Sequence, residues 1–333
     1  MYNAAKYIER CVRSLFEQTY ENLEFLFVDD CSSDNSVSLL YNVIEENPSR
    51  KSIVKVIRHE TNKGVSVARN TLLTNVSGDF FTFVDADDRI PHDAVELLVS
   101  KQLETNADLV SGNMIIEYDN DNVFVEEPPY NNAYEMLKHI VGQQGHHENV
   151  GRLFRTKIVR DNKLLYTHGI NIGEDWLFLV KFVLFVSKIA SIPQVVYYYD
   201  RRNTQSAMHS IMSERNLQKW YLADLRVLDE IKNIVSKSVQ MDFSSHDNTV
   251  LKIGDDGFRE AALKSDKETF EAIKSIVLPY LKSRKNMIVG KYNRYSFLGN
   301  PNYYMCKFYV TALNIKYRKF KFREFFTRHF TLI

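Results

Sequence analysis

Apolar and polar positions follow two periods along the chain, and these periods predict its elements. Apolar residues recur at steps of three and four from Ala4 to Gln18, so we expect an amphipathic helix there with Asn3 as its N-cap. Helices with the same period are predicted to begin near residues 36, 65, 94 and 174. Short runs of β-formers predict strands at residues 23–30, 53–58, 80–84, 108–116, 123–125 and 189–200. This alternation predicts an α/β protein with a mostly parallel central sheet flanked by helices.

Two of the predicted strands end in carboxylates. These residues are Asp29 and Asp30 after the first strand, and Asp85, Asp87 and Asp88 after the run FFTFV. Open α/β sheets bind ligands at the carboxyl ends of their strands. Crowded carboxylates raise one another's pKa unless a cation neutralises them, so the D-x-D pattern suits Mg²⁺ or Mn²⁺ shared with a diphosphate. Taken alone, the pattern more often marks a solvated acidic turn, and other motifs must decide.

The composition limits the classes of protein that fit. With 44% hydrophobic residues, the chain can bury a substantial core. Its 43 basic and 42 acidic residues give a net charge of +1, so no global charge favours nucleic acid. The three cysteines are widely spaced without a C-x-x-C pair, which argues against a zinc site and fits a reducing compartment. No signal peptide or spanning segment is evident, so we expect a cytoplasmic protein.

Several classes of nucleotide-binding protein are excluded because the sequence does not contain their characteristic motif. The chain has neither the G-x-G-x-x-G of a dinucleotide-binding dehydrogenase nor a P-loop. A receiver domain has an acidic pair after a strand but is one small domain. A sugar-phosphate nucleotidyltransferase would need a glycine-rich, lysine-bearing loop near its start. Chemistry in which a metal holds a diphosphate leaving group remains.

The second half of the chain changes character. Glu174 and Asp175 open a strongly apolar predicted helix, where they are equally well explained as first-turn acids that favour the helix dipole. After about residue 210 helical patterning dominates, with polar turns predicted at SSHDN and IGDDG. We therefore place a domain boundary near 210.

The last residues form a basic and aromatic tail. The segment from Lys307 to Ile333 contains seven Lys and Arg residues, interspersed with aromatic residues, and its one acidic residue is Glu324. Such a tail suits peripheral binding to an anionic membrane at the inner face of the cell membrane. A docked terminal helix with a solvated basic face fits equally well. RNA binding is a weaker alternative because no recognition module accompanies the tail.

Five motifs occur in one order over roughly residues 1–205: MYN at 1–3, VDDCSSDNS at 28–36, NKGVSVARN at 62–70, VDADD at 84–88 and GEDW at 173–176. With them the chain resembles bacterial family-2 glycosyltransferases, which implies the GT-A nucleotide-binding fold. The resemblance implies a catalytic domain at 1–210, with a nucleotide-sugar half at about 1–116 and an acceptor half at about 117–210. Residues 211–333 would form a helical C-terminal extension.

The resemblance also implies roles for individual residues. Nucleotide-binding residues would be Tyr2 beside the base, Asp29 and Asp30 at the uracil or ribose, Lys63, Gly64 and Arg69 around the nucleotide, and Asp85 at the ribose or metal. Asp30 is favoured for the base, and Arg69 for bracing the acidic loops. Asp87, with Asp85, would hold Mn²⁺ or Mg²⁺. Asp175 would be the general base, with Glu174 a weaker candidate, and Arg201, Arg202 or Ser206 would touch phosphate or product.

The sequence departs from the family pattern at its start. Family members carry a short apolar strand before the Tyr-Asn pair, whereas here Met1 stands directly before Tyr2. Omitting a central strand would leave backbone donors and acceptors unpaired on both sides, at a cost on the order of several kcal/mol. We therefore expect Met1 to be an internal methionine of a longer chain, which mass spectrometry of the native N-terminus would test.

The expected function is sugar transfer. A metal-dependent, inverting glycosyltransferase would move a hexose or N-acetylhexosamine from a nucleotide sugar, with UDP favoured, to a hydroxyl of a surface glycan or lipid-linked acceptor. The alternative is a degenerate GT-A domain that binds nucleotide or scaffolds a glycan-assembly complex without catalysis.

Overall fold

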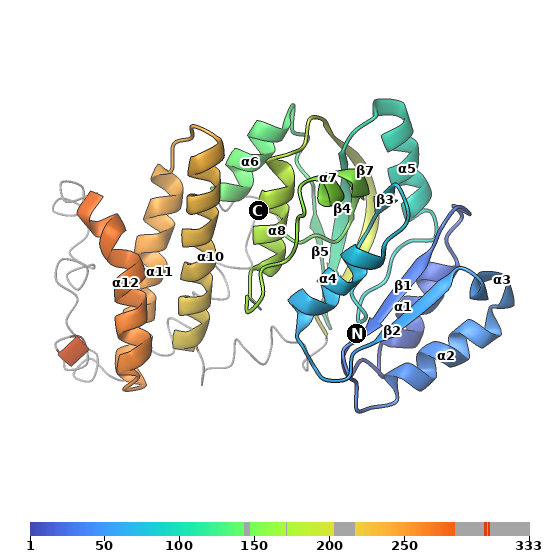
Figure 1. The fold of residues 1–333 in the computed structure, drawn as a ribbon, viewed down its shortest axis with the longest axis horizontal. Helices are drawn as coiled ribbons and strands as arrows, with labels where there is room; N and C mark the ends of the chain where they lie inside the picture. Colours follow the sequence, from blue (N-terminus) through green and yellow to red (C-terminus); the bar gives the residue numbers. More distant parts are fainter. Residues whose placement is uncertain (143–146, 171, 203–216, 284–302, 305, 307–333) are drawn as a thin grey trace. The chain divides into compact units, whose positions relative to one another are not determined.

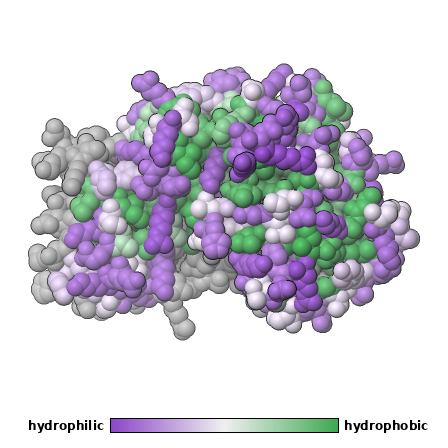
Figure 2. All heavy atoms as spheres, viewed as in Figure 1, coloured by the Kyte–Doolittle hydropathy of each residue, from purple (hydrophilic) through white to green (hydrophobic). Residues whose placement is uncertain are grey.

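The computed structural model describes residues 1–142, 147–170, 172–202, 217–283, 303, 304 and 306 (Figure 1). Its internal contacts divide the chain into two compact units, one made of Met1–Ile140 and Gly145–Thr204, the other of Val141–Gln144 and Gln205–Ile333. The predictions for Ser206 and for the tail from Lys307 to Ile333 lie outside the described residues. Hydrophilic and hydrophobic residues are interspersed on the face shown in Figure 2.

The first sheet of unit 1 has two parallel strands, β1 (Phe25–Asp29) and β2 (Val54–Arg58). They are joined through α2 (Ser36–Glu46) and α3 (Pro48–Lys51), and α3 begins with a proline. Helices α1 (Ile8–Phe16) and α2 bury their apolar faces against strand β1 in one hydrophobic core. This core contains Ile8, Val12, Phe16, Phe25, Phe27, Leu40, Val43 and Ile44.

The start of α1 differs from the prediction. The helix begins at Ile8 after a turn, and its N-cap position is Tyr7 rather than Asn3. Asn3 has a left-handed φ of 49°, and its side-chain oxygen accepts a hydrogen bond from the backbone N–H of Ser33 at 2.9 Å. The prediction of an Asn3 N-cap was wrong because this side chain binds the loop after β1 instead.

The second sheet of unit 1 is built on β4 (Leu109–Glu117). Along one edge β4 pairs in parallel with β7 (Ile189–Asp200), and the other edge pairs antiparallel with β6 (Arg152–Arg155) and then β5 (Asn122–Val125). Strand β3 (Phe80–Phe81) pairs antiparallel with β6. The longest pairings, β1–β2 and β4–β7, are parallel, and the others are antiparallel. The α/β class with helices around a central sheet is confirmed.

Strand β3 is shorter than predicted. Only Phe80 and Phe81 pair in the ladder, and Phe83 forms an isolated bridge with Val150. The Phe83 ring lies 5.3 to 6.4 Å from the rings of Phe81, Phe154, Tyr166 and Phe178. The apolar run therefore serves an aromatic cluster as much as a strand.

Five further helices complete unit 1. They are α4 (Val65–Asn75), α5 (Ala94–Thr105), α6 (Ala133–Val141), α7 (Thr156–Asp161) and α8 (Glu174–Val183). Of these, α4 packs against β1 and α5 against the second sheet. Helix α5 packs Ala94, Val95 and Leu98 against Val110 and Val196 of β4 and β7. Helix α8 begins at residue 174, as predicted, and ends at Val183.

Unit 2 is formed by α10 (Leu217–Ser238), α11 (Ser244–Leu263) and α12 (Lys267–Ser283). The polar turns predicted at SSHDN and IGDDG are wrong, because both segments lie within α11. A Cβ added at Gly254 would lie 2.6 Å from Val277, and one at Gly257 would lie 2.8 Å from Ile273. The glycines therefore permit close packing with α12 rather than a turn. None of the helices in the described part of the chain has the length and apolar character needed to cross a bilayer.

Candidate active site

The loop after β1 is folded around two buried carboxylates. Asp29 is fully buried, and its Oδ1 accepts a hydrogen bond from the backbone N–H of Ser32 at 3.1 Å. The Arg58 Nε lies 3.0 Å from its Oδ2. Asp29 is therefore held on both oxygens by its own surroundings, and Asp30, at 4% exposure, stands nearer to the surface of the site.

Asp30 organises the next loop of the site. Its Oδ1 lies 2.7 Å from His59 Nδ1 and accepts the backbone N–H of Lys63 at 2.9 Å, and its Oδ2 accepts the N–H of Gly64 at 2.8 Å. Burial alone would raise the pKa of Asp30, but the hydrogen bonds from His59 and the two backbone groups lower it below its usual value. Because a carboxylate has about four acceptor positions, one remains for a ligand.

Tyr2, Lys63 and Gly64 border the same end of β1. The backbone N–H of Asp30 donates to the carbonyl of Met1 at 2.9 Å, which places Tyr2 beside the strand end with its side chain 51% exposed. Lys63 is exposed. Gly64 precedes α4 with a φ of 86°, a conformation that favours glycine. The structure thus gathers these predicted nucleotide-binding residues around the carboxyl end of β1.

The acidic turn at residues 85–88 is held from inside by Tyr197 of β7. The buried Tyr197 hydroxyl donates to Asp88 Oδ2 at 2.6 Å and accepts the backbone N–H of Asp85 at 3.1 Å. The other oxygen of Asp88 accepts the N–H of Asp200 at 2.7 Å. Burial and the neighbouring Asp87 and Asp85 raise the pKa of Asp88 well above its usual value. Asp88 is therefore an internal support, whereas the Asp85 side chain is 37% exposed.

Arg69 of α4 joins this turn to the first turn of α8. Its Nη2 donates to the Asp85 carboxylate at 3.1 and 3.3 Å. Its Nη1 donates to Glu174 at 2.9 Å and also to Asp175. Burial alone would lower the pKa of Arg69, but Asp175 and Asp85 raise it well above its usual value, so the side chain stays charged. One buried cation thus gathers three acids that are far apart in the sequence.

Asp175 is the acid of this cluster best suited to proton transfer. Burial raises its pKa to about 7 against the opposing charge of Arg69, and the neighbouring Glu174 adds to the rise. Asn149 Nδ2 donates to its Oδ1 at 3.1 Å. A carboxyl group that titrates near neutral pH can both take up and release a proton, as a general base requires.

Sequence reasoning missed several side chains that position this cluster. Ser66 Oγ donates to the carbonyl of Ile170 at 2.6 Å. Asn70 Nδ2 donates to the Tyr166 carbonyl at 3.0 Å, and its Oδ1 accepts the Tyr166 N–H at 2.8 Å. These contacts dock α4 on the segment before GEDW. Positions 66, 69 and 70 share one helix face, so a polar stripe inside NKGVSVARN was the signal that could have found them.

The two predicted arginines after β7 contact carboxylates and an aromatic ring. Arg202 Nη2 lies 2.7 Å from Asp200 Oδ2 and 3.2 Å from Glu117 Oε2. The Arg201 guanidinium lies 4.7 Å from the centre of the Tyr199 ring. Their predicted contact with phosphate stays a prediction.

The predicted metal ligands Asp85 and Asp87 lie on the same short turn. In the part of the chain that the structure describes, no three His, Cys, Asp or Glu side chains form a ready cluster for a metal ion. A Mg²⁺ or Mn²⁺ shared with a diphosphate needs only one or two protein carboxylates, and Asp85 is exposed enough to provide one. The donor set therefore fits such a cation.

Several curated bacterial proteins are similar to this chain. Glycosyltransferase GlyA of Streptococcus pneumoniae is 30% identical over 237 residues, which cover 65% of this chain but only 33% of GlyA. The poly(ribitol-phosphate) β-N-acetylglucosaminyltransferase TarS of Staphylococcus aureus is 27% identical over 219 residues, 63% of this chain and 36% of TarS. The glucosyltransferase WfgD of Escherichia coli, which acts on α-D-GlcNAc-diphosphoundecaprenol with UDP-Glc, is 36% identical over 136 residues, 41% of this chain and 51% of WfgD.

Solved structures share the fold. The structure of S. aureus TarS residues 1–349 with UDP-GlcNAc matches with a TM-score of 0.62 at 21% identity, covering 85% of this chain and 79% of that one. At such identity the likeness shows the fold alone, which is the GT-A fold of these glycosyltransferases. The sequence of residues 1–182 matches the family model described as glycosyl transferase family 2. The chain therefore belongs to glycosyl transferase family 2.

Proposed function

We propose that the protein transfers a sugar from a nucleotide sugar, most favourably a UDP-sugar, to a hydroxyl group of a phosphate-bearing cell-envelope glycan. The observation that carries the proposal is the Arg69 cluster, which brings Asp85 and Asp175 together. In this proposal residues 1–116 bind the nucleotide sugar, 117–210 contribute most of the acceptor site, and 211–333 form an extension.

The choice of substrates follows the relatives. The name of WfgD specifies UDP-Glc as donor and a diphosphate-linked lipid acceptor, and that of TarS specifies a poly(ribitol-phosphate) acceptor. A further relative is a teichoic acid poly(glycerol phosphate) polymerase of Staphylococcus epidermidis, 28% identical over 203 residues. Each of these three names contains a phosphate ester, and TarS structures contain UDP or UDP-GlcNAc. A phosphate-bearing acceptor is therefore the class that we propose.

The proposed chemistry is a direct displacement. Asp175 accepts the proton of the acceptor hydroxyl while that oxygen forms a bond to the anomeric carbon of the sugar. The bond from this carbon to the nucleoside diphosphate breaks on the opposite face, so the anomeric configuration inverts. Arg69 holds Asp175 in place and favours its deprotonated form. A divalent cation held by Asp85 and Asp87 would supply positive charge to the departing diphosphate.

The nucleotide half would bind the donor at the end of β1. The remaining acceptor position of Asp30 suits a hydrogen-bond donor of the base or ribose, and the exposed ring of Tyr2 suits stacking on the base. The backbone of residues 63–64, fixed by Asp30, shapes the other wall.

A nucleotide-release assay tests the proposal. The protein is incubated with Mn²⁺, a phosphate-bearing acceptor and a panel of UDP- and GDP-sugars, and release of nucleotide is followed with and without chelation of the metal. We expect turnover with one UDP-sugar and its loss in Asp87→Ala and Asp175→Ala. Asp161→Ala, which removes an exposed carboxylate from α7, serves as the control.

Two results would contradict the proposal. Turnover that is unchanged in Asp175→Ala would rule out the proposed base. A nucleotide that raises the melting temperature, with no turnover of any sugar nucleotide, would instead support a binding domain without catalysis.

A further inference from the structure

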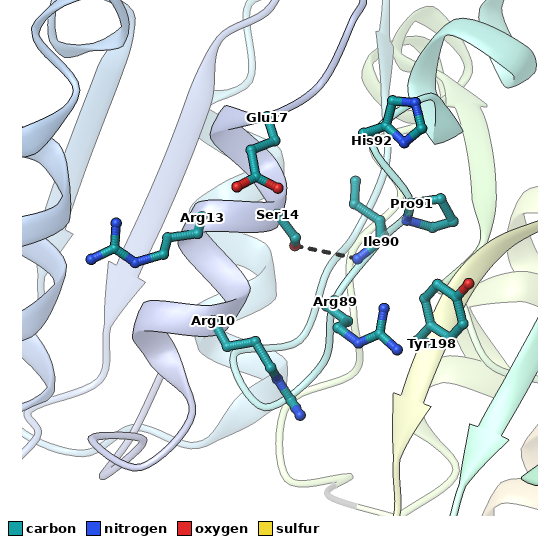
Figure 3. A pocket seen from close by; sticks show the side chains of 9 residues that line it. All are labelled: Arg10, Arg13, Ser14, Glu17, Arg89, Ile90, Pro91, His92 and Tyr198. Atoms are coloured by element: carbon teal, nitrogen blue, oxygen red, sulfur yellow. Dashed lines mark hydrogen bonds between the residues drawn. The ribbon is translucent and has the colours of Figure 1, made fainter.

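A second cationic site lies in a groove beside the acidic turn (Figure 3). The groove has a volume of about 650 Å³ and runs between α1 and residues 89–92, with Tyr198 of β7 at one side. Three arginines line it, Arg10, Arg13 and Arg89. None of the residues proposed above for the nucleotide, the metal or the base lines this groove.

The walls of the groove are fixed by hydrogen bonds. Gln18 Nε2 of the residues after α1 donates to the Pro91 carbonyl at 2.6 Å, and the Ile90 N–H donates to Ser14 Oγ at 3.3 Å. The Tyr198 N–H donates to the Arg89 carbonyl at 2.9 Å. Residues 89–92 are therefore tied to both neighbouring elements, and the groove is preorganised for a ligand.

Buried carboxylates orient two of the arginines from behind. Arg10 Nη2 lies 2.6 Å from Asp200, whose side chain is 2% exposed, and Arg89 Nη2 lies 2.7 Å from Glu117, which is 12% exposed. The arginine side chains themselves are 36% and 32% exposed. The Arg89 guanidinium also stacks 3.7 Å from the centre of the Tyr198 ring.

These two guanidinium groups keep donors for a ligand. A guanidinium has five N–H donors, and among the described residues the hydrogen bonds of the Arg10 and Arg89 guanidinium groups all come from Nη2. In Figure 3 both groups lie toward the end of the groove nearest Tyr198, while Glu17, the acid of the lining, lies toward the other end. Oriented, partly exposed guanidinium groups match the oxygens of a phosphate group.

We propose that this end of the groove binds a phosphate group of the acceptor. The inference rests on the proposed function, which it extends by assigning the part of the chain that recognises the acceptor's phosphate. Arg10 Nη2 also donates to the carbonyl oxygen of Asp87 at 2.6 Å, so the same side chain contacts the groove and the turn that would hold the metal. The acceptor phosphate thus binds next to the donor site without sharing the nucleotide-binding residues.

Direct binding tests this inference without requiring turnover. Glycerol 3-phosphate and N-acetylglucosamine 1-phosphate are titrated into the full chain by calorimetry, with glycerol and N-acetylglucosamine as neutral counterparts, in the absence and presence of UDP. We expect only the phosphate esters to bind, with UDP present as well as absent. Preference between the two esters distinguishes a polyol-phosphate acceptor from a sugar-phosphate one.

Variants locate the binding. Arg89→Gln is expected to weaken phosphate binding about tenfold, the loss of one charge-assisted hydrogen bond, and Arg89→Lys to weaken it less. Arg10→Gln changes the other arginine at this end of the groove and provides a second test if Arg89→Gln does not fold. Arg226→Gln removes an exposed arginine of α10 and is the matched control.

The outcomes separate this inference from the proposed function. Failure of both esters to bind, or equal binding by the wild type, Arg89→Gln and Arg10→Gln, overturns the groove assignment while sugar transfer can still be measured. Phosphate binding that depends on Arg89, in a protein that turns over no sugar nucleotide, supports the groove and contradicts the proposed function.

Discussion

The buried Arg69 and the groove arginines Arg10 and Arg89 lie beside the acidic turn, and burial separates what they do. Arg69 is 7% exposed, and its guanidinium donates to Asp85, Glu174 and Asp175. Arg10 and Arg89 are each about one third exposed and are held by carboxylates on one side only. A buried cation surrounded by acids fixes the positions of those acids. A partly exposed cation held by a carboxylate on one side retains donors for a ligand.

The largest expected effect on stability comes from replacing the buried Arg69. Arg69→Met would leave three acids without their shared cation, so the free energy of unfolding should fall by about 3–5 kcal/mol, measured by urea denaturation. Arg226→Met on α10 is the matched control and should change little. An unchanged urea midpoint in Arg69→Met would mean that the acids do not depend on this cation.

Asp175 gives the next largest effect, on rate rather than stability. Asp175→Asn should lower kcat by about 10² to 10⁴-fold, the usual contribution of a general base. Because a base must be deprotonated, kcat of the wild type should fall as pH drops below the pKa of about 7. The residual rate of Asp175→Asn should lack this step. A wild-type pH profile that is flat between pH 5 and 8 would argue against Asp175 as base.

A variant of Tyr197 tests whether its hydroxyl group stabilises the acidic turn at residues 85–88. Tyr197→Phe removes the hydroxyl shared by Asp85 and Asp88 and should destabilise the protein by about 1–3 kcal/mol. It should also raise the Mn²⁺ concentration needed for half-maximal activity, because Asp85 would be held less firmly. Tyr199→Phe on the same strand is the control. Equal metal dependence of the wild type and Tyr197→Phe would show that the turn does not need this hydroxyl.

The smallest effect on stability is expected at Arg13, the most exposed arginine of the groove. Arg13 lies 2.7 Å from Glu46, and both side chains are about half exposed. Arg13→Gln should therefore change the free energy of unfolding by less than about 1 kcal/mol, measured by the same urea denaturation. If Arg13→Gln lowered the free energy of unfolding as much as Arg69→Met, burial would not explain the difference between the buried and the exposed arginines.

The sequence predicted most of the elements because their signals are local. The strand at residues 189–200 and the helix after Gly64 were located by a run of β-formers and by a glycine with a helical period after it. The helix that contains Gly254 and Gly257 was missed because glycine signals a turn locally. These glycines are needed within the helix because Val277 and Ile273 of helix α12 pack closely against them, and this tertiary contact cannot be predicted from local sequence.

The site shows the same limit. Motif order brought out Asp85, Arg69 and Asp175 but could not show that one guanidinium joins them, since that contact is tertiary. The groove arginines carried no motif at all. Arg10 is on an ordinary amphipathic helix, and Arg89 follows an acidic motif that draws attention to its carboxylates. Only the fold places them on one groove.

The loop before α4 has a consequence for engineering donor selectivity. Asp30 holds this loop through the backbone N–H groups of residues 63 and 64, so its path does not depend on the Lys63 side chain, which is exposed. Position 63 can therefore be varied to change the charge beside the proposed nucleotide site while the backbone of the loop keeps its path. Position 64 has no such freedom, because its φ of 86° reserves it for glycine.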